Sequence, residues 1–225
     1  MNTNMPLYTS LTPGNKYELV FEQQLTRRVT IALRPLSLPG DWPYIGKWLQ
    51  REFGRRIAST THLPEKYLRE TLSIMLQCDF AQPLVGLINE QPAFLVEICD
   101  GDKQCDSLEG GTHLYKPGDH TMRLLLSHPV IHTRYWSEYA LFTSLNYFFS
   151  HPQVKRIVWQ LHEKDTFNKN LANQLGFTPY SRVDAASGDS RQVGTGWSGV
   201  QVYLYLRDNF TRFLSNYYQH LQKLP

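Results

Sequence analysis

The chain has 225 residues, 41% of them hydrophobic and 13% aromatic, which supports a packed globular fold and excludes a disordered protein. Lys and Arg number 23 and Asp and Glu 20, without a long block of one charge, so the composition supports neither nucleic-acid binding nor a membrane-surface protein. No apolar run is long enough to span a bilayer. Three cysteines without a C-x-x-C pair indicate reduced thiols rather than disulfides or a zinc site, and the first residues lack a signal-peptide pattern, so we expect a cytoplasmic protein.

Residues 1–25 show little periodicity and are expected to form an N-terminal arm with at most one strand, near residues 17–21. A folded domain is expected over residues 26–206, where the hydrophobic period switches repeatedly between that of strands and that of helices. An apolar stripe over residues 207–225 predicts an amphipathic helix that packs on the domain. Within the domain the expected elements are, in chain order, a strand at 29–33, a turn at 38–41, a helix at about 42–53, a helix that opens at 62–65 and continues to 76, a hairpin of strands at 84–88 and 93–98, a strand at 122–126, a helix at about 135–149, a strand at 157–159, a short helix that ends at 175, and strands at 178–183 and 200–206.

Two features of this order favour a functional site near the middle of the chain. The longest irregular segment lies between Asp100 and Asp119, and long loops in compact domains are often functional. Arg123 then interrupts the apolar run at 122–126, where a charge must reach a partner or a cleft.

Residues 154–177, VKRIVWQLHEKDTFNKNLANQLGF, combine a strand, a polar loop and a short helix that ends on Gly176-Phe177. This unit resembles the second half of the acetyl-CoA fold of the GNAT superfamily of N-acetyltransferases. Four further stretches resemble its siderophore branch, the hydroxylysine acetyltransferases and mycobactin lysine acyltransferases: LRPL at 33–36, YIGKWL at 44–49, FLVEI at 94–98 and YxPGDxxxRLL at 115–125. The resemblance spans roughly residues 28–206. It implies an α/β (α+β) GNAT fold, with a mixed, mostly antiparallel central sheet flanked by helices and an added C-terminal helix.

The chain departs from the family pattern at the phosphate loop and at the acid/base positions. GNAT enzymes usually carry R/Q-x-x-G-x-G/A before the helix that follows the central strand, whereas this chain has HTRYWS at 132–137. Within that stretch only Arg134 and the small Ser137 suit phosphate binding. The family's central-strand histidine aligns with Arg123, and the acidic residue after the next strand aligns with His162.

The resemblance implies an enzyme that transfers an acyl group, expected to be acetyl, from acyl-CoA to a small-molecule amine or hydroxylamine acceptor, expected to be an N-hydroxylated amino acid or polyamine, in hydroxamate siderophore biosynthesis. Acetyl-CoA is then a co-substrate, and neither a bound cofactor nor a metal is expected. The catalytic candidates are His162, as general base or leaving-group acid, and Arg123. The residues expected to contact acyl-CoA are Leu124, Leu125, Leu126, Arg134, Ser137 and Asp165. Glu97 and Asp119 are candidates for the amine end of the acceptor, and His120, like Arg123, for its carboxylate.

Other interpretations of the same residues stay open. A histidine at a strand end is often an ordinary surface residue, Glu97 could face solvent, and Asp119 could serve the Pro-Gly turn. The altered phosphate loop would also fit a non-catalytic GNAT-like scaffold. A GNAT enzyme with an unrelated acceptor, such as an antibiotic or a protein N-terminus, is a further alternative. The C-terminal stripe could form a homodimer seam instead of docking on its own domain.

Overall fold

The computed structural model describes residue 7 and residues 18–56, 64–105, 115–127, 134–183 and 199–221. An eight-stranded sheet in the order β1-β2-β3-β4-β5-β6-β8-β7 forms its centre. All neighbouring strands are antiparallel except β5 and β6, which are parallel. The strands are β1 Phe21–Thr26, β2 Val29–Pro35, β3 Ala81–Ile88, β4 Gln91–Asp100, β5 Asp119–Leu126, β6 Arg156–His162, β7 Thr178–Val183 and β8 Val200–Leu206. The expected mixed, mostly antiparallel sheet is therefore confirmed.

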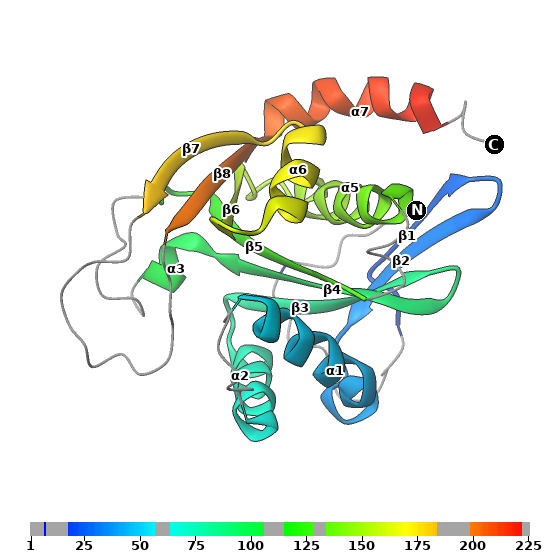
Figure 1. The fold of residues 1–225 in the computed structure, drawn as a ribbon. Helices are drawn as coiled ribbons and strands as arrows, with labels where there is room; N and C mark the ends of the chain where they lie inside the picture. Colours follow the sequence, from blue (N-terminus) through cyan, green and yellow to red (C-terminus); the bar gives the residue numbers. More distant parts are fainter. Residues whose placement is uncertain are drawn as a thin grey trace.

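Helices cover both faces of this sheet (Figure 1). Helices α1 and α2 lie on one face, and α5, α6 and α7 lie on the other. The helices are α1 Leu38–Arg56, α2 Glu65–Gln77, the short α3 Gly101–Cys105, α5 Arg134–Ser150, α6 Thr166–Gln174 and α7 Arg207–Leu221. Among the described residues, none of these helices combines the length and the apolar character that crossing a bilayer requires.

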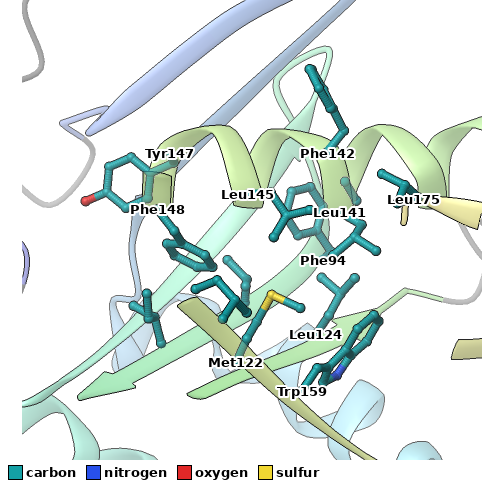
Figure 2. Close-up of a cluster of buried hydrophobic side chains, with 14 of the residues drawn as sticks. Phe94, Met122, Leu124, Leu141, Phe142, Leu145, Tyr147, Phe148, Trp159 and Leu175 are labelled. Atoms are coloured by element: carbon teal, nitrogen blue, oxygen red, sulfur yellow. The ribbon is translucent and has the colours of Figure 1, made fainter. Parts of the chain in front are cut away.

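The larger core lies between the sheet and α5. Figure 2 shows α5 crossing above the strands, with apolar side chains filling the space between them. The labelled side chains of this larger core include Phe94 of β4, Met122 and Leu124 of β5, Trp159 of β6, and Leu141, Leu145 and Phe148 of α5. A smaller core packs α1 and α2 against Val85, Leu95 and Leu125 on the opposite face. Successive side chains of a strand point to opposite faces of the sheet. Each site residue on a strand therefore belongs either to the face of the larger core or to the face covered by α1 and α2, called the α1/α2 face below.

A two-residue loop joins β3 to β4 and confirms the predicted hairpin, with β4 beginning earlier than expected, at Gln91. Asn89 and Glu90 both have positive φ, +47° and +67°, as a type I′ hairpin turn requires. The Asn89 side chain also accepts a hydrogen bond from the Thr30 N–H at 2.9 Å and donates one to the Arg28 carbonyl at 3.1 Å. This asparagine thus fixes the β3–β4 turn against the β1–β2 turn.

The expected boundaries differ from the structure at two places near the N-terminus. Most of β1 comes from residues expected in the N-terminal arm, because Phe21 to Gln24 pair with β2 as the edge of the same sheet. Helix α1 begins at Leu38, within the expected turn, since the Ser37 carbonyl accepts the N–H groups of Gly40 and Asp41. Proline is well tolerated in a first helical turn, so Pro39 does not interrupt α1.

Candidate active site

Strands β5 and β6 are paired only along their first halves. Their ladder runs from the Asp119–Arg156 pair to the Met122–Trp159 pair and then ends. Beyond it, residues 123–126 stay paired with β4, and residues 160–162 stay paired with β8. The backbone groups that these two segments turn toward each other lie outside any strand ladder. Such a split at the carboxyl ends of parallel strands is a favoured ligand site, and an extended ligand can pair there like a strand.

The expected acyl-CoA contacts Leu124, Leu125 and Leu126 form the β5 side of this split. Ser137 lies in the first turn of the helix that follows β5, where it is 2% exposed. The N-terminus of a helix carries a partial positive charge and attracts phosphate groups. Arg134 is the first residue of the same helix; its side chain and residues 128–133, with most of the altered phosphate loop, lie outside the described part of the chain.

The structure brings Glu97 and Arg123 together and places His120 elsewhere. Glu97 and Arg123 are directly opposite each other in the β4–β5 ladder, and an Arg123 Nη2 to Glu97 Oε1 contact of 2.5 Å joins them. Both lie on the α1/α2 face, because their neighbours Val96 and Met122 point into the larger core. The Glu97 side chain is 5% exposed and that of Arg123 is 35% exposed, so the guanidinium can reach a ligand from solvent.

His120 lies on the opposite face from Arg123, so the two cannot share one acceptor carboxylate. Its side chain is buried, and its Nδ1 lies 3.3 Å from the Gly118 carbonyl oxygen. Burial lowers the pKa of the imidazole below its ordinary value, which keeps the ring neutral at physiological pH.

Asp119 is engaged within the protein. Its carboxylate accepts a hydrogen bond from Arg156 Nε at 2.7 Å, contacts the same guanidinium through Nη2, and accepts another from the Lys116 N–H at 2.8 Å. Both side chains are nearly inaccessible to solvent, at 3% for Asp119 and 10% for Arg156. These contacts give Asp119 a structural role at the start of β5 and leave its charge compensated, so it does not present a free carboxylate to an amine.

His162 ends β6 at the split and is 6% exposed. Its Nδ1 accepts a hydrogen bond from the Lys164 N–H at 3.1 Å, and among the described residues its buried Nε2 has no hydrogen-bond partner. An imidazole that accepts at Nδ1 in its neutral form carries its proton on Nε2. This ring therefore offers an N–H donor, not a basic lone pair, at Nε2.

The turn after His162 is held by hydrogen bonds from several directions. Asp165 caps α6 by accepting from the Asn168 N–H at 3.1 Å and from the Asn168 side chain at 2.8 Å, so its expected contact with acyl-CoA gains no support. The Glu163 carboxylate pairs with Arg182 at 2.8 Å, and its N–H donates to the Gly199 carbonyl at 3.0 Å. Gly199 has φ +68°, a backbone conformation that favours glycine at this position.

Three further features of this region were not anticipated from the sequence. Arg156 neutralises Asp119, and Gln160 donates a hydrogen bond to the Tyr115 hydroxyl at 2.7 Å. Asp119 and Tyr115 lie far from these partners in the chain, so no local sequence pattern indicates either contact. Burial raises the pKa of the Cys99 thiol to about 12, which makes this cysteine on the α1/α2 face a poor nucleophile. No group of three or more His, Cys, Asp or Glu side chains that could hold a metal occurs among the described residues.

Comparison with known proteins relates this arrangement to one family. The family model described as "Acetyltransferase (GNAT) domain" matches residues 37–185. No curated protein matches the chain in a sequence search. A structure of an uncharacterized protein from Bacillus halodurans is similar with a TM-score of 0.71 at 14% identity, over 89% of this chain and 97% of that one.

Two similar structures have named activities. An aminoglycoside acetyltransferase in complex with coenzyme A gives a TM-score of 0.64 at 14% identity, over 81% of this chain and 98% of that one. A chimera of spermidine N-acetyltransferase from Vibrio cholerae gives 0.59 at 12% identity, over 80% and 98%. At these identities the similarity shows the fold, and the acceptors belong to those proteins.

Proposed function

Because this chain belongs to the acetyltransferase (GNAT) domain family, we propose that it transfers an acetyl group from acetyl-CoA to an N-hydroxylated amino acid or polyamine, in cytoplasmic biosynthesis of a hydroxamate siderophore. The acceptor nitrogen attacks the thioester carbonyl carbon in a ternary complex. The C–N bond forms, the C–S bond breaks, and the proton lost by nitrogen leaves with the CoA thiol or to solvent. No acyl-enzyme is needed, which agrees with the raised pKa of the buried Cys99 thiol.

We propose that acetyl-CoA binds at the split between β5 and β6. The pantetheine arm is an extended chain with amide groups, and it can pair with the backbone of Leu124, Leu125 and Leu126 as an additional strand. The pyrophosphate then lies at the start of α5, the helix whose first turn contains Arg134 and Ser137.

His162 is proposed to stabilise the oxyanion of the tetrahedral intermediate. Its Nε2–H is the one polar side-chain group at the β6 side of the split that is buried without a partner among the described residues. A neutral imidazole that donates to a developing oxyanion needs no proton transfer, and a hydrogen bond formed only in the transition state accelerates the reaction. This tautomer has no lone pair at Nε2, so it does not favour the expected general base; the oxyanion donor is a further role, proposed beside the expected general base and leaving-group acid. A hydroxylamine nitrogen is largely neutral at physiological pH and needs less help from a base than an ammonium does.

The Glu97–Arg123 pair is the observation that supports an amino acid as the acceptor. Its partly exposed guanidinium can bind the carboxylate of an amino acid, and the adjacent Glu97 can bind the amino group. The Glu97–Arg123 pair contains one charge of each sign, so it can match both charges of a zwitterion, and the Asp119 charge is compensated by Arg156. A polycation such as an aminoglycoside or spermidine is better matched by an excess of acidic groups, so this pair fits a zwitterion better.

An acceptor panel tests this proposal. Purified full-length protein would be incubated with acetyl-CoA and with Nε-hydroxylysine, lysine, spermidine or kanamycin, while thiol release and product mass are followed. We expect Nε-hydroxylysine to have the highest kcat/KM and to gain one acetyl group. Replacing Arg123 by Gln should raise the KM for this acceptor about tenfold or more while that for acetyl-CoA changes little.

Lys66→Gln is the matched control, since it also removes a cation from an ion pair, an exposed 3.8 Å pair within α2. Its kinetic constants should equal those of the wild type. Acetylation of spermidine or kanamycin with none of Nε-hydroxylysine would contradict the proposed acceptor class.

A further inference from the structure

Tyr115 and Gln160 form a hydrogen-bonded pair of neutral side chains at the split of the sheet. Gln160 Nε2 donates to the Tyr115 hydroxyl oxygen at 2.7 Å. Gln160 directly follows Trp159, the last β6 residue in the ladder with β5, so this pair marks the point where the strands separate. Gln160 is exposed, and a ligand that enters the split can therefore contact it.

Tyr115 is held in place from its other side. A Cβ at Gly101, the first residue of α3, would lie 3.0 Å from Tyr115 Cδ1, so the ring packs closely on this glycine. The ring thus extends from the end of β4 to the middle of β6, two strands away in the sheet. A side chain fixed at both ends can position a polar group with little loss of conformational entropy on binding.

The Tyr115–Gln160 pair belongs to the α1/α2 face, like the Glu97–Arg123 pair. Trp159 and Leu161 point into the larger core, so Gln160 between them points to the opposite side. Arg123 is the first residue of β5 beyond the shared ladder, and Gln160 is the first of β6. The charged pair and the neutral pair therefore lie on either side of the same opening.

We propose that Gln160, held in place by Tyr115, binds the N–OH group of the acceptor and thereby selects a hydroxylamine over the corresponding amine, an inference that rests on the proposed function. The acceptor hydroxyl can donate to Gln160 Oε1, which accepts no hydrogen bond from the described residues, while the Tyr115 hydroxyl oxygen accepts from Gln160 Nε2 and fixes the orientation of the amide. A primary amine is an ammonium ion at neutral pH, and a neutral pair gives it no compensating charge. A site that hydrogen-bonds a substrate hydroxyl discriminates strongly against an analogue that lacks it.

The test is the ratio of kcat/KM for Nε-hydroxylysine to that for lysine, measured with the full chain and acetyl-CoA. We expect Tyr115→Phe and Gln160→Leu each to lower this ratio about tenfold or more, through slower reaction of the hydroxylysine. Tyr180→Phe is the matched control: Tyr180 lies on β7 with its ring over Arg156, 6.0 Å from ring centroid to guanidinium carbon, and away from the split. Its ratio should equal that of the wild type.

Thermal unfolding and acetyl-CoA binding of the variants separate selection from a structural role. Both should stay at wild-type values in Gln160→Leu, because this side chain is exposed. An unchanged ratio in both Tyr115→Phe and Gln160→Leu, with Nε-hydroxylysine still acetylated, overturns this inference and leaves the proposed function intact. A wild-type protein that does not acetylate Nε-hydroxylysine overturns both.

Discussion

At the scale of single residues, the proposed mechanism depends most on which nitrogen of His162 carries the proton. His162→Asn places an amide oxygen where Nδ1 accepts from Lys164 and removes Nε2. We expect this variant to fold with wild-type stability and to lose about 10² to 10³ in kcat, the usual effect of removing one oxyanion donor. Steady-state thiol release with Nε-hydroxylysine measures the loss.

The complementary variant His162→Gln serves as its control. Glutamine is long enough to bring an amide N–H near the position of Nε2 but abandons the bond to Lys164. We expect His162→Gln to recover part of the kcat that His162→Asn loses. Its free energy of unfolding should be lower than that of the wild type, because the hydrogen bond from the Lys164 N–H is lost. If His162→Asn keeps the wild-type kcat, His162 is a structural residue at the end of β6 and the proposed donor role is wrong.

His120 makes stability depend on pH. Burial lowers the pKa of its imidazole below the ordinary value of about 6.5, so the unfolded chain binds a proton that the folded protein does not bind. The free energy of unfolding should therefore fall as pH drops below about 6.5, and this loss should stop once pH is below the folded-state pKa.

Urea denaturation between pH 8 and pH 5 measures this dependence. His120→Gln should show a smaller loss on acidification than the wild type, because its side chain does not titrate. Equal pH dependence of the two proteins would show that His120 contributes nothing to it.

Some of this residue-level arrangement could be predicted from the sequence. Residues 120 and 123 lie on one strand and are three positions apart, so their side chains point to opposite faces of the sheet. This separation of His120 from Arg123 could be predicted from the sequence. The partners of Asp119 and Glu97 could not be predicted, because Arg156 and Arg123 reach them through the sheet register, and register depends on contacts between distant segments. The donor at His162 depends on one backbone hydrogen bond, which no sequence pattern indicates.

At the scale of elements, one arginine joins the last helix to the rest of the fold. The Arg207 guanidinium donates to the carbonyl oxygens of Phe149 at 2.5 Å and Val154 at 3.0 Å, and also to that of His151. These carbonyls lie at and after the C-terminal end of α5, where backbone acceptors lack helical partners and a cation is favourable. Phe210, one turn later, stacks on Phe149 with centroids 5.1 Å apart.

We therefore expect Arg207→Ala to lower the free energy of unfolding by about 2–3 kcal/mol, since it leaves several carbonyls without a charged donor. Urea denaturation measures this change. Arg212→Ala on the exposed face of the same helix is the control and should change stability by less than about 0.5 kcal/mol. Equal effects of the two substitutions would contradict the role assigned to Arg207.

The elements themselves were largely predictable, because most have a clear hydrophobic period. The strands at 178–183 and 200–206 begin and end where alternation predicts. The expected start of α1 was wrong, since Pro39-Gly40 suggested a turn, although a serine shortly before a proline, here Ser37 two residues before Pro39, is also typical of a helix start. Edge strand β1 is mostly polar or partly exposed, so its sequence lacks a clear hydrophobic period. Its pairing with β2 in the structure shows that it is a strand.

At the scale of the whole molecule, the mixed, mostly antiparallel sheet flanked by helices agrees with what the family resemblance implies, but the split of the sheet was not predicted. The sequence predicts strands at 122–126 and 157–159, yet nothing local indicates that they pair or that their ladder ends at Met122 and Trp159. Beyond that endpoint the facing backbone of β5 and β6 lies outside their shared ladder, and the proposed acyl-CoA site depends on this split. The central claim is therefore that the split between β5 and β6 binds acetyl-CoA.

Isothermal titration calorimetry of acetyl-CoA into the full chain tests this claim most directly. We predict saturable binding in the micromolar range, about tenfold or more weaker in Arg134→Ala and unchanged in Arg212→Ala, because only the first lies at the start of α5. Absence of binding at millimolar acetyl-CoA, or equal affinity in Arg134→Ala and the wild type, would contradict it. The first of these results would indicate a non-catalytic scaffold built on the acetyltransferase fold.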